Sequence, residues 1–89
     1  MSRVQVELAA LLRSYTGGAS VVAANGTTLG EVLDDLDRRF RGIRFRIVDE
    51  QDRLRPHVRF FVNGIDTREI ATALDEGDRI YIVGALSGG

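Results

Sequence analysis

The 89-residue sequence contains no cysteine and no lysine, and it has a single histidine, His57. Without cysteine the chain has no disulfide, no thiolate metal site and no thiol nucleophile. Without lysine it offers no Schiff-base amine, no phosphate-binding lysine of the P-loop kind and no side-chain acceptor for an isopeptide bond. All twelve basic residues are arginine, so positive charge is retained while these reactions are excluded.

A large excess of charge and a long apolar run are also lacking. The formal net charge is −1, so we expect neither nucleic acid nor an anionic membrane as a partner. No apolar run approaches the roughly 20 residues of a membrane span. Gln5 and Glu7 interrupt the N-terminal segment, which therefore lacks the apolar stretch of a signal peptide. We expect a cytoplasmic protein.

The remaining polar residues do not assemble into a catalytic set. His57 stands beside Pro56, where an exposed or structural role is the simplest interpretation. Asp34, Asp35 and Asp37 come nearest to an all-carboxylate metal site, but their positions predict a solvated face early in a helix. The glycines follow neither the GxGxxG nor the P-loop pattern. We predict no catalytic residue, no metal site and no bound cofactor, and hence a protein that is not an enzyme.

Hydrophobic periodicity predicts several strands. Residues 3–9 alternate between apolar and polar side chains, as half-buried strands do. In residues 57–62 the same period places Val58, Phe60 and Val62 on one face, and in residues 79–86 it places Ile80 and Ile82 inward. Residues 19–24 have strand-like propensity and end at the turn signal Asn25-Gly26, so a first hairpin is expected.

Two further segments are less regular. Residues 43–56 predict a short helical turn and then a polar loop. After the strong turn signal Asn63-Gly64, residues 65–78 predict a short strand and a single helical turn.

Residues 27–40 carry the clearest helical signal. Thr28 and Glu31 fit a capping box, in which each side chain satisfies a free amide at the helix start. Apolar residues follow at helical spacing and form one stripe. Because one amphipathic helix covers one face of one sheet, the pattern predicts an α+β two-layer domain. The stripe consists of Leu29, Val32, Leu33, Leu36 and Phe40.

The face of the sheet away from the helix is expected to stay open. Phe61 and Tyr81 fall on that face, with Ala9 and Val83 beside them and polar residues between. A cluster with two aromatics on an uncovered sheet face predicts a protein-docking patch. Coverage by another loop or by a second copy is the alternative.

The arginines are unevenly placed along the chain. Eight of the twelve lie between residues 38 and 59, against three acidic residues there. A solvated face is the ordinary interpretation of such a segment, and an acidic protein partner is the alternative.

The sequence ends with Gly88 and Gly89, shortly after the last predicted strand. Glycine lacks a Cβ, so such a tail can thread a channel too narrow for side chains and present an unhindered carboxylate. From Val83 to Gly89 the chain reaches about 23 Å when extended, at ~3.3 Å per residue. We expect a domain at residues 1–83 and a flexible tail at residues 84–89.

With these features in place, the sequence resembles the MoaD/ThiS family of ubiquitin-like sulfur carriers over essentially its whole length. The resemblance is carried by "LLRSYTGG", "TTLGEVLDDLDRRF", "HVRFFVNGIDTR" and "LDEGDRIYIVGALSGG". It implies the β-grasp fold, with a mixed sheet of about four to five strands and one main helix packed on one face.

The resemblance also implies the chemistry. In the family, an adenylating enzyme of the ubiquitin-activating type uses ATP-Mg to convert the terminal glycine carboxylate to an acyl-adenylate. A sulfur donor then converts the adenylate to a thiocarboxylate, which delivers sulfur to a biosynthetic enzyme. Carried over to this chain, Gly89 is the adenylated and thiolated residue and Gly88 is its threading neighbour.

One departure bears on the pathway. Many members have a proline shortly before the tail, where this chain has Gly84 and Ala85. The departure weakens assignment to the molybdopterin branch, whereas residues 55–68 look closer to MoaD-like and CysO-like carriers. The implied sulfur acceptors are a pyridoxal-phosphate-dependent cysteine synthase, the large subunit of molybdopterin synthase, or an enzyme of another sulfur-containing metabolite.

Two other functions remain open on the sequence. The chain could be a ubiquitin-like modifier that forms isopeptides through Gly89. It could also be a binding module that acts through Phe61, Tyr81 and Val83 with an inert tail.

Overall fold

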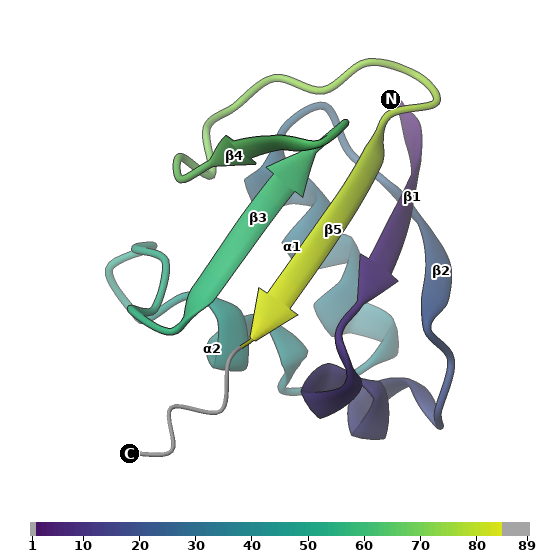
Figure 1. Cartoon of the computed structure of the whole chain (residues 1–89), viewed down its shortest axis with the longest axis vertical. Helices are drawn as coiled ribbons and strands as arrows, with labels where there is room; N and C mark the ends of the chain where they lie inside the picture. The colour runs from purple at the N-terminus through teal and green to yellow at the C-terminus, as the bar shows by residue number, and fades with distance from the viewer. Residues whose placement is uncertain (1, 85–89) are drawn as a thin grey trace.

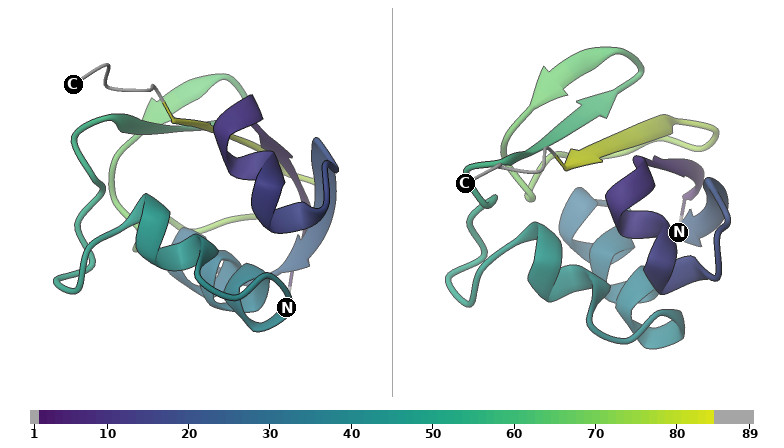
Figure 2. Two further views of the ribbon diagram at one scale, coloured as in Figure 1. Left: turned by 90° about the horizontal axis from the view of Figure 1, so that it is seen from below. Right: turned by 60° about the horizontal axis from the view of Figure 1, so that its bottom comes forward.

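The computed structural model describes residues 2–84 and shows one mixed sheet with helices packed on one face (Figure 1 and Figure 2). This is the expected α+β two-layer arrangement. The elements follow in the order β1 (Arg3–Leu8), the 3-10 helix η1 (Ala10–Thr16), β2 (Val21–Asn25), α1 (Leu29–Arg39), α2 (Ile43–Ile47), β3 (Val58–Val62), β4 (Ile65–Thr67) and β5 (Arg79–Gly84).

The sheet has five strands in the order β2-β1-β5-β3-β4. β1 and β5 run parallel at its centre, with Gln5 opposite Arg79, and the other neighbours run antiparallel. The four long strands predicted from periodicity are confirmed as β1, β2, β3 and β5. The first hairpin is also confirmed, although η1 lies between its two strands.

The core lies between the inner face of the sheet and the helices. Val4, Val6 and Leu8 of β1 alternate with exposed residues, as the predicted pattern requires. Phe60 of β3 is fully buried at the centre of this layer. Burying a side chain of this size contributes about 1.5–3 kcal/mol. The predicted stripe of α1 is buried at Leu29, Val32, Leu33 and Leu36, while Phe40 is only partly buried.

Helix α1 begins at the predicted cap, with one difference in hydrogen bonding. The Thr28 hydroxyl accepts a hydrogen bond from the Glu31 amide at 3.2 Å, as a capping box requires. The Glu31 carboxylate reaches one residue further back, where it accepts from the Thr27 hydroxyl at 2.6 Å and from its amide at 2.7 Å. These two bonds lower the pKa of Glu31.

The helical turn predicted within residues 65–78 is wrong. Only β4 forms in the first part, and the rest is an irregular loop whose backbone crosses the start of α1. The carbonyls of Thr72 and Ile70 accept hydrogen bonds from the Leu29 and Gly30 amides at 3.1 and 2.8 Å. The first amides of a helix have no partner within it, so this loop stabilises α1 instead of forming a helix of its own.

The remaining local predictions are confirmed with one addition. The segment before Gly17, for which no helix was predicted, forms η1. Helix α2 and the loop after it match the predicted helical turn and polar loop. Asn63 and Gly64 have φ values of 50° and 84°, the positive torsions of a tight hairpin turn. Within residues 2–84, no helix has the length and apolar content that crossing a membrane would require.

Candidate functional site

The outer face of the sheet brings the two predicted aromatic residues together. Phe61 of β3 lies directly opposite Tyr81 of β5, and Glu7 of β1 lies opposite Tyr81 on its other side. The ring centroids of Phe61 and Tyr81 are 6.4 Å apart and the rings are tilted by 35°. Tyr81 is 39% exposed although it belongs to a central strand. An aromatic pair therefore faces outward where no helix covers the sheet.

Ala9 and Val83, the other two predicted docking residues, lie at one end of this face. Val83 is half-buried and lies opposite Arg59 in the β3–β5 pairing. Ala9 follows the end of β1, is half-buried, and donates its amide hydrogen to the Ile82 carbonyl at 3.0 Å. Both residues border the aromatic pair, but neither lines the hollow described next.

A shallow hollow of about 730 Å³ lies over the aromatic pair. Its wall includes polar residues that periodicity alone did not single out, among them Asn63 and Arg79. Sequence reasoning used Asn63 only as a turn signal, and nothing in the pattern placed that turn beside β5. The hollow is lined by Gln5, Glu7, Val21, Phe61, Asn63, Gly64, Arg79, Ile80 and Tyr81.

Asn63 holds the rim of this hollow in place. Its side-chain amide donates to Asp78 at 2.9 Å, and its side-chain oxygen accepts from the Arg79 amide at 3.0 Å. The Asp75 amide and the Asn63 side chain lower the pKa of Asp78. The β3–β4 turn is thus tied to the start of β5, which fixes the position of Tyr81 two residues later.

β5 leads toward the predicted reactive tail. Its last residue, Gly84, lies opposite Val58, the first residue of β3. Gly84 lies within the strand predicted at residues 79–86 and ends β5, although the tail was predicted to begin at this residue. Gly88 and Gly89, the predicted sites of threading and thiolation, lie outside the described residues.

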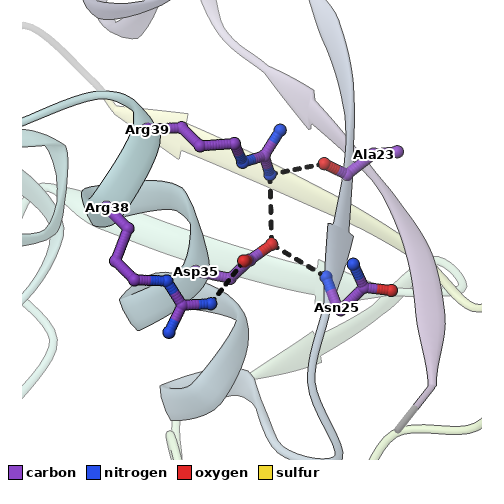
Figure 3. Close-up of polar contacts among 5 residues, drawn as sticks. All are labelled: Ala23, Asn25, Asp35, Arg38 and Arg39. Carbon is purple, nitrogen blue, oxygen red and sulfur yellow. Dashed lines mark hydrogen bonds and ion pairs between the residues drawn. The ribbon is translucent and has the colours of Figure 1, made fainter.

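The prediction that Asp34, Asp35 and Asp37 share a solvated face is wrong for Asp35. Asp35 is only 9% exposed, and its carboxylate accepts a hydrogen bond from the Asn25 amide of β2 at 3.0 Å (Figure 3). The carboxylate also binds Arg38 at 2.6 Å and Arg39 at 3.1 Å. Arg39 in turn donates to the Ala23 carbonyl at 2.6 Å. Asp35 therefore fastens α1 to the edge strand β2.

The surroundings of Asp35 set its ionisation. Burial alone would raise the pKa of Asp35, but the Asn25 amide and the two arginines outweigh it and lower the pKa. The other two carboxylates also have structural partners: Asp34 lies 2.8 Å from Arg44 Nε, and Asp37 accepts from the Gly42 and Arg44 amides. In residues 2–84, no three acidic or histidine side chains gather as a metal ion would require.

Comparison with known proteins places this geometry in a family. The ThiS family matches residues 6–89. The chain belongs to the ThiS family. It is 38% identical over 91 residues to the sulfur carrier protein CysO of Mycobacterium tuberculosis, covering 97% of this chain and 98% of that protein. A crystal structure of Mycobacterium tuberculosis CysO superposes with a TM-score of 0.86, at 36% identity over 93% of this chain and 99% of that one.

Two further relatives extend the comparison. CysO in the BexX/CysO complex of Amycolatopsis orientalis superposes with a TM-score of 0.87, at 34% identity, covering 97% of this chain and 99% of that one. Small archaeal modifier protein 3 of Haloferax volcanii is 28% identical, over 97% of this chain and 98% of that protein. These likenesses confirm the ubiquitin-like β-grasp fold.

Proposed function

We propose that this chain is a sulfur carrier protein whose Gly89 carboxylate becomes a thiocarboxylate. The observation that supports the proposal most strongly is the 38% identity to the sulfur carrier protein CysO across nearly the whole chain. The Gly88-Gly89 ending supplies the group that such a reaction needs.

The proposed chemistry takes two steps. An oxygen of the Gly89 carboxylate attacks the α-phosphorus of ATP, whose Mg²⁺ complex is bound by the activating enzyme, and pyrophosphate leaves. Sulfide, or an equivalent donor, then attacks the acyl carbon and AMP leaves, which gives the thiocarboxylate. Activation is needed because a carboxylate is a poor electrophile, whereas the adenylate carries a good leaving group. In this scheme the chain is a substrate and its partners supply the catalysis.

The folded domain would serve as the recognition platform. The outward-facing pair of half-buried Phe61 and exposed Tyr81, with the hollow over it, favours docking onto the adenylating enzyme. With Ala9 and Val83 at the end of the same face, the contact surface would extend along β5 toward the tail. Docking there would bring the Gly89 carboxylate within reach of an active site.

For the sulfur acceptor we propose a pyridoxal-phosphate-dependent cysteine synthase. This acceptor is the one that a CysO-like carrier implies, and the relatives named CysO support it. The BexX/CysO complex shows that an Amycolatopsis relative binds a protein partner. The large subunit of molybdopterin synthase is the competing acceptor, and the absence of a proline near Gly84 argues against it.

The test is to incubate the chain with ATP-Mg, its adenylating enzyme and sulfide, and to measure its intact mass. We expect the gain that corresponds to replacing one oxygen by sulfur. Deleting Gly89 should abolish this gain while circular dichroism shows an unchanged fold. An unchanged mass for the wild-type chain with an enzyme that adenylates it would contradict the proposal.

A second candidate, a ubiquitin-like modifier, is favoured by the relationship to Small archaeal modifier protein 3. In that role Gly89 would form isopeptide bonds with lysines of other proteins. The chain itself has no lysine, so it could not build lysine-linked chains on itself. Gly89-linked peptides in digests of cellular protein would support this role, and their absence from cells with thiocarboxylated carrier would count against it.

A further inference from the structure

The middle of the sequence carries positive charge that the proposed carrier chemistry does not use. Residues 38–59 hold eight of the twelve arginines but only three of the thirteen acidic residues. The rest of the chain is correspondingly acidic, so the net charge of −1 conceals a strong segregation. A block of one sign on a near-neutral protein favours contact with a surface of the opposite sign.

Half of these arginines are neutralised within the fold. Four contact carboxylates: Arg38 and Arg39 bind Asp35, Arg44 lies against Asp34 and Asp52, and Arg59 contacts Asp66. Among residues 2–84, the other four have no carboxylate within ion-pair distance, and these are Arg41, Arg46, Arg53 and Arg55. The uncompensated charge therefore lies on α2 and its flanking loops.

Two acidic residues of the same loop, Asp49 and Glu50, offset this charge in part. Asp49 accepts hydrogen bonds from the amides of Arg53 and Gln51. The Arg53 amide is the main cause of its lowered pKa, and the charges of Arg53 and Arg55 contribute less. Two carboxylates, Asp49 and Glu50, cannot balance four arginines, so a positive excess remains.

An exposed aromatic residue stands within this basic region. Phe45 projects from α2 and is 59% exposed, although its helix neighbours Ile43 and Ile47 are fully buried. The guanidinium carbon of Arg55 lies 4.4 Å from the centre of the Phe45 ring, and Arg55 Nε donates to the Phe45 carbonyl at 2.6 Å. The arginine and the ring thus hold each other in place. Aromatic and arginine side chains are the types that dominate protein interfaces.

This basic region adjoins the strand that leads to the tail. The Val58 amide donates to the Arg55 carbonyl at 3.0 Å, and Val58 lies opposite Gly84. Figure 1 and Figure 2 show α2, the loop before β3 and the end of β5 at one end of the molecule. Gly89 is five residues beyond Gly84, so a partner that takes up the C-terminal glycine must lie within about 17 Å of this end.

We propose that Phe45, Arg46 and Arg55 form a second docking surface, which binds an acidic patch on the adenylating enzyme. This basic surface lies on the helical side, and the Phe61–Tyr81 face lies on the other side of the sheet. A partner that binds both surfaces would contact the domain on both sides of the sheet. The inference rests on the proposed carrier function for the identity of its partner, and on the charges and contacts above for its chemistry.

The decisive comparison uses two charge reversals of equal size. Arg46→Glu changes the basic surface, and Arg3→Glu changes an exposed arginine at the start of β1, at the opposite end of the sheet. With an adenylating enzyme that supports ATP–pyrophosphate exchange, we expect Arg46→Glu to raise the KM for the carrier about tenfold at low salt and to leave kcat unchanged. Phe45→Ala should raise KM as well, and Arg3→Glu should not. Equal KM values for the two reversals would overturn the proposal.

A second experiment tests the basic docking surface without any enzyme, and its result is therefore independent of the carrier function. Octaglutamate is added to the protein while the backbone amide chemical shifts are recorded. The amides of residues 43–55 should shift in the wild-type chain and should not shift in Arg46→Glu. Shifts spread over all the arginines would overturn the proposal, even if no enzyme supports exchange and the carrier function itself fails. Tighter binding of duplex DNA at the same residues would overturn the assignment to a protein partner. Thermal melts of each variant confirm that it is folded.

Discussion

Phe61 and Tyr81 face each other across the β3–β5 pairing, with their ring centroids 6.4 Å apart on the side of the sheet that no helix covers. Within residues 2–84, no helix lies over this side of β3 and β5, whereas α1 lies over the opposite side (Figure 1 and Figure 2). Aromatic side chains that face solvent contribute less to the stability of the monomer than buried ones do. Aromatic residues are also among those that contribute most to the binding energy of protein interfaces.

We therefore expect the double change Phe61→Ala and Tyr81→Ala to weaken binding to the adenylating enzyme about tenfold or more. The free energy of unfolding should fall by about 1–3 kcal/mol, from the aromatic pair itself and from the partial burial of Phe61. Titration calorimetry and chemical unfolding provide the two measurements. Ile65→Ala is the control, because Ile65 is 70% exposed on the edge strand β4. Equal losses of affinity in both variants would contradict a docking role for the pair.

The Asp35→Asn variant tests how much the contacts of Asp35 between α1 and β2 stabilise the fold. The lowered pKa of Asp35 means that its carboxylate stabilises the fold fully above the pKa of an unfolded aspartate, about 3.9. That contribution is lost as the pH falls through the still lower pKa of the folded state. We expect the variant to lose about 1–3 kcal/mol of stability at neutral pH.

The pH dependence separates this effect from a general loss of packing. Urea unfolding of wild type and Asp35→Asn between pH 2 and 7 should give curves that converge at the acid end, because the wild-type carboxyl is then also uncharged. A stability difference that stays constant over the whole range would show that the charge of Asp35 is not what matters.

Two glycine-to-alanine changes should differ sharply. A Cβ at Gly26 would lie 2.7 Å from the Val32 amide nitrogen and 2.9 Å from the Glu31 Cβ, while at Gly84 it would meet no atom within 4 Å. We expect Gly26→Ala to cost about 1–3 kcal/mol through overpacking of the start of α1. Gly84→Ala should leave stability within about 0.5 kcal/mol of wild type. Thermal melts of both variants would test this, and similar melting temperatures would contradict the close approach at Gly26.

Replacing Phe60 or Phe45 by alanine tests how much the burial of each side chain contributes to stability. Phe60 is fully buried between β3 and the helices, and Phe45 is 59% exposed. Phe60→Ala should lose about 3–5 kcal/mol, enough to unfold much of a domain this small. Phe45→Ala should stay folded, with a melt close to that of wild type. A folded and fully cooperative Phe60→Ala variant would show that the core tolerates the cavity.

The sequence was sufficient wherever one local rule decided the outcome. Alternation placed Val4, Phe60 and Ile82 in the core, and Thr28 marked the start of α1. The turn at Asn63 and Gly64 followed from its two residue types. The same alternation placed Phe61 and Tyr81 on one face, because strand register alone brings them together.

The predictions that were wrong involve contacts between segments that are distant from each other in the sequence. Asp35 sits at the margin of the apolar stripe, and only the approach of the Asn25 amide explains why it is buried. The loop after β4 fails to form a helical turn because its carbonyls bind the free amides of Leu29 and Gly30. Neither partner is near in sequence, so neither periodicity nor capping rules reveal these contacts.

The parallel pairing of β1 with β5 joins residues as far apart in the chain as Gln5 and Arg79. Contacts at that separation form only after most of the intervening chain is available to close the loop. During synthesis, the strand that completes the centre of the sheet emerges from the ribosome after the four others. A chain that stops before β5 lacks Ile80 and Ile82 from its core as well as Tyr81 from its outer face. A truncated chain would therefore lack both a complete core and the outer aromatic pair.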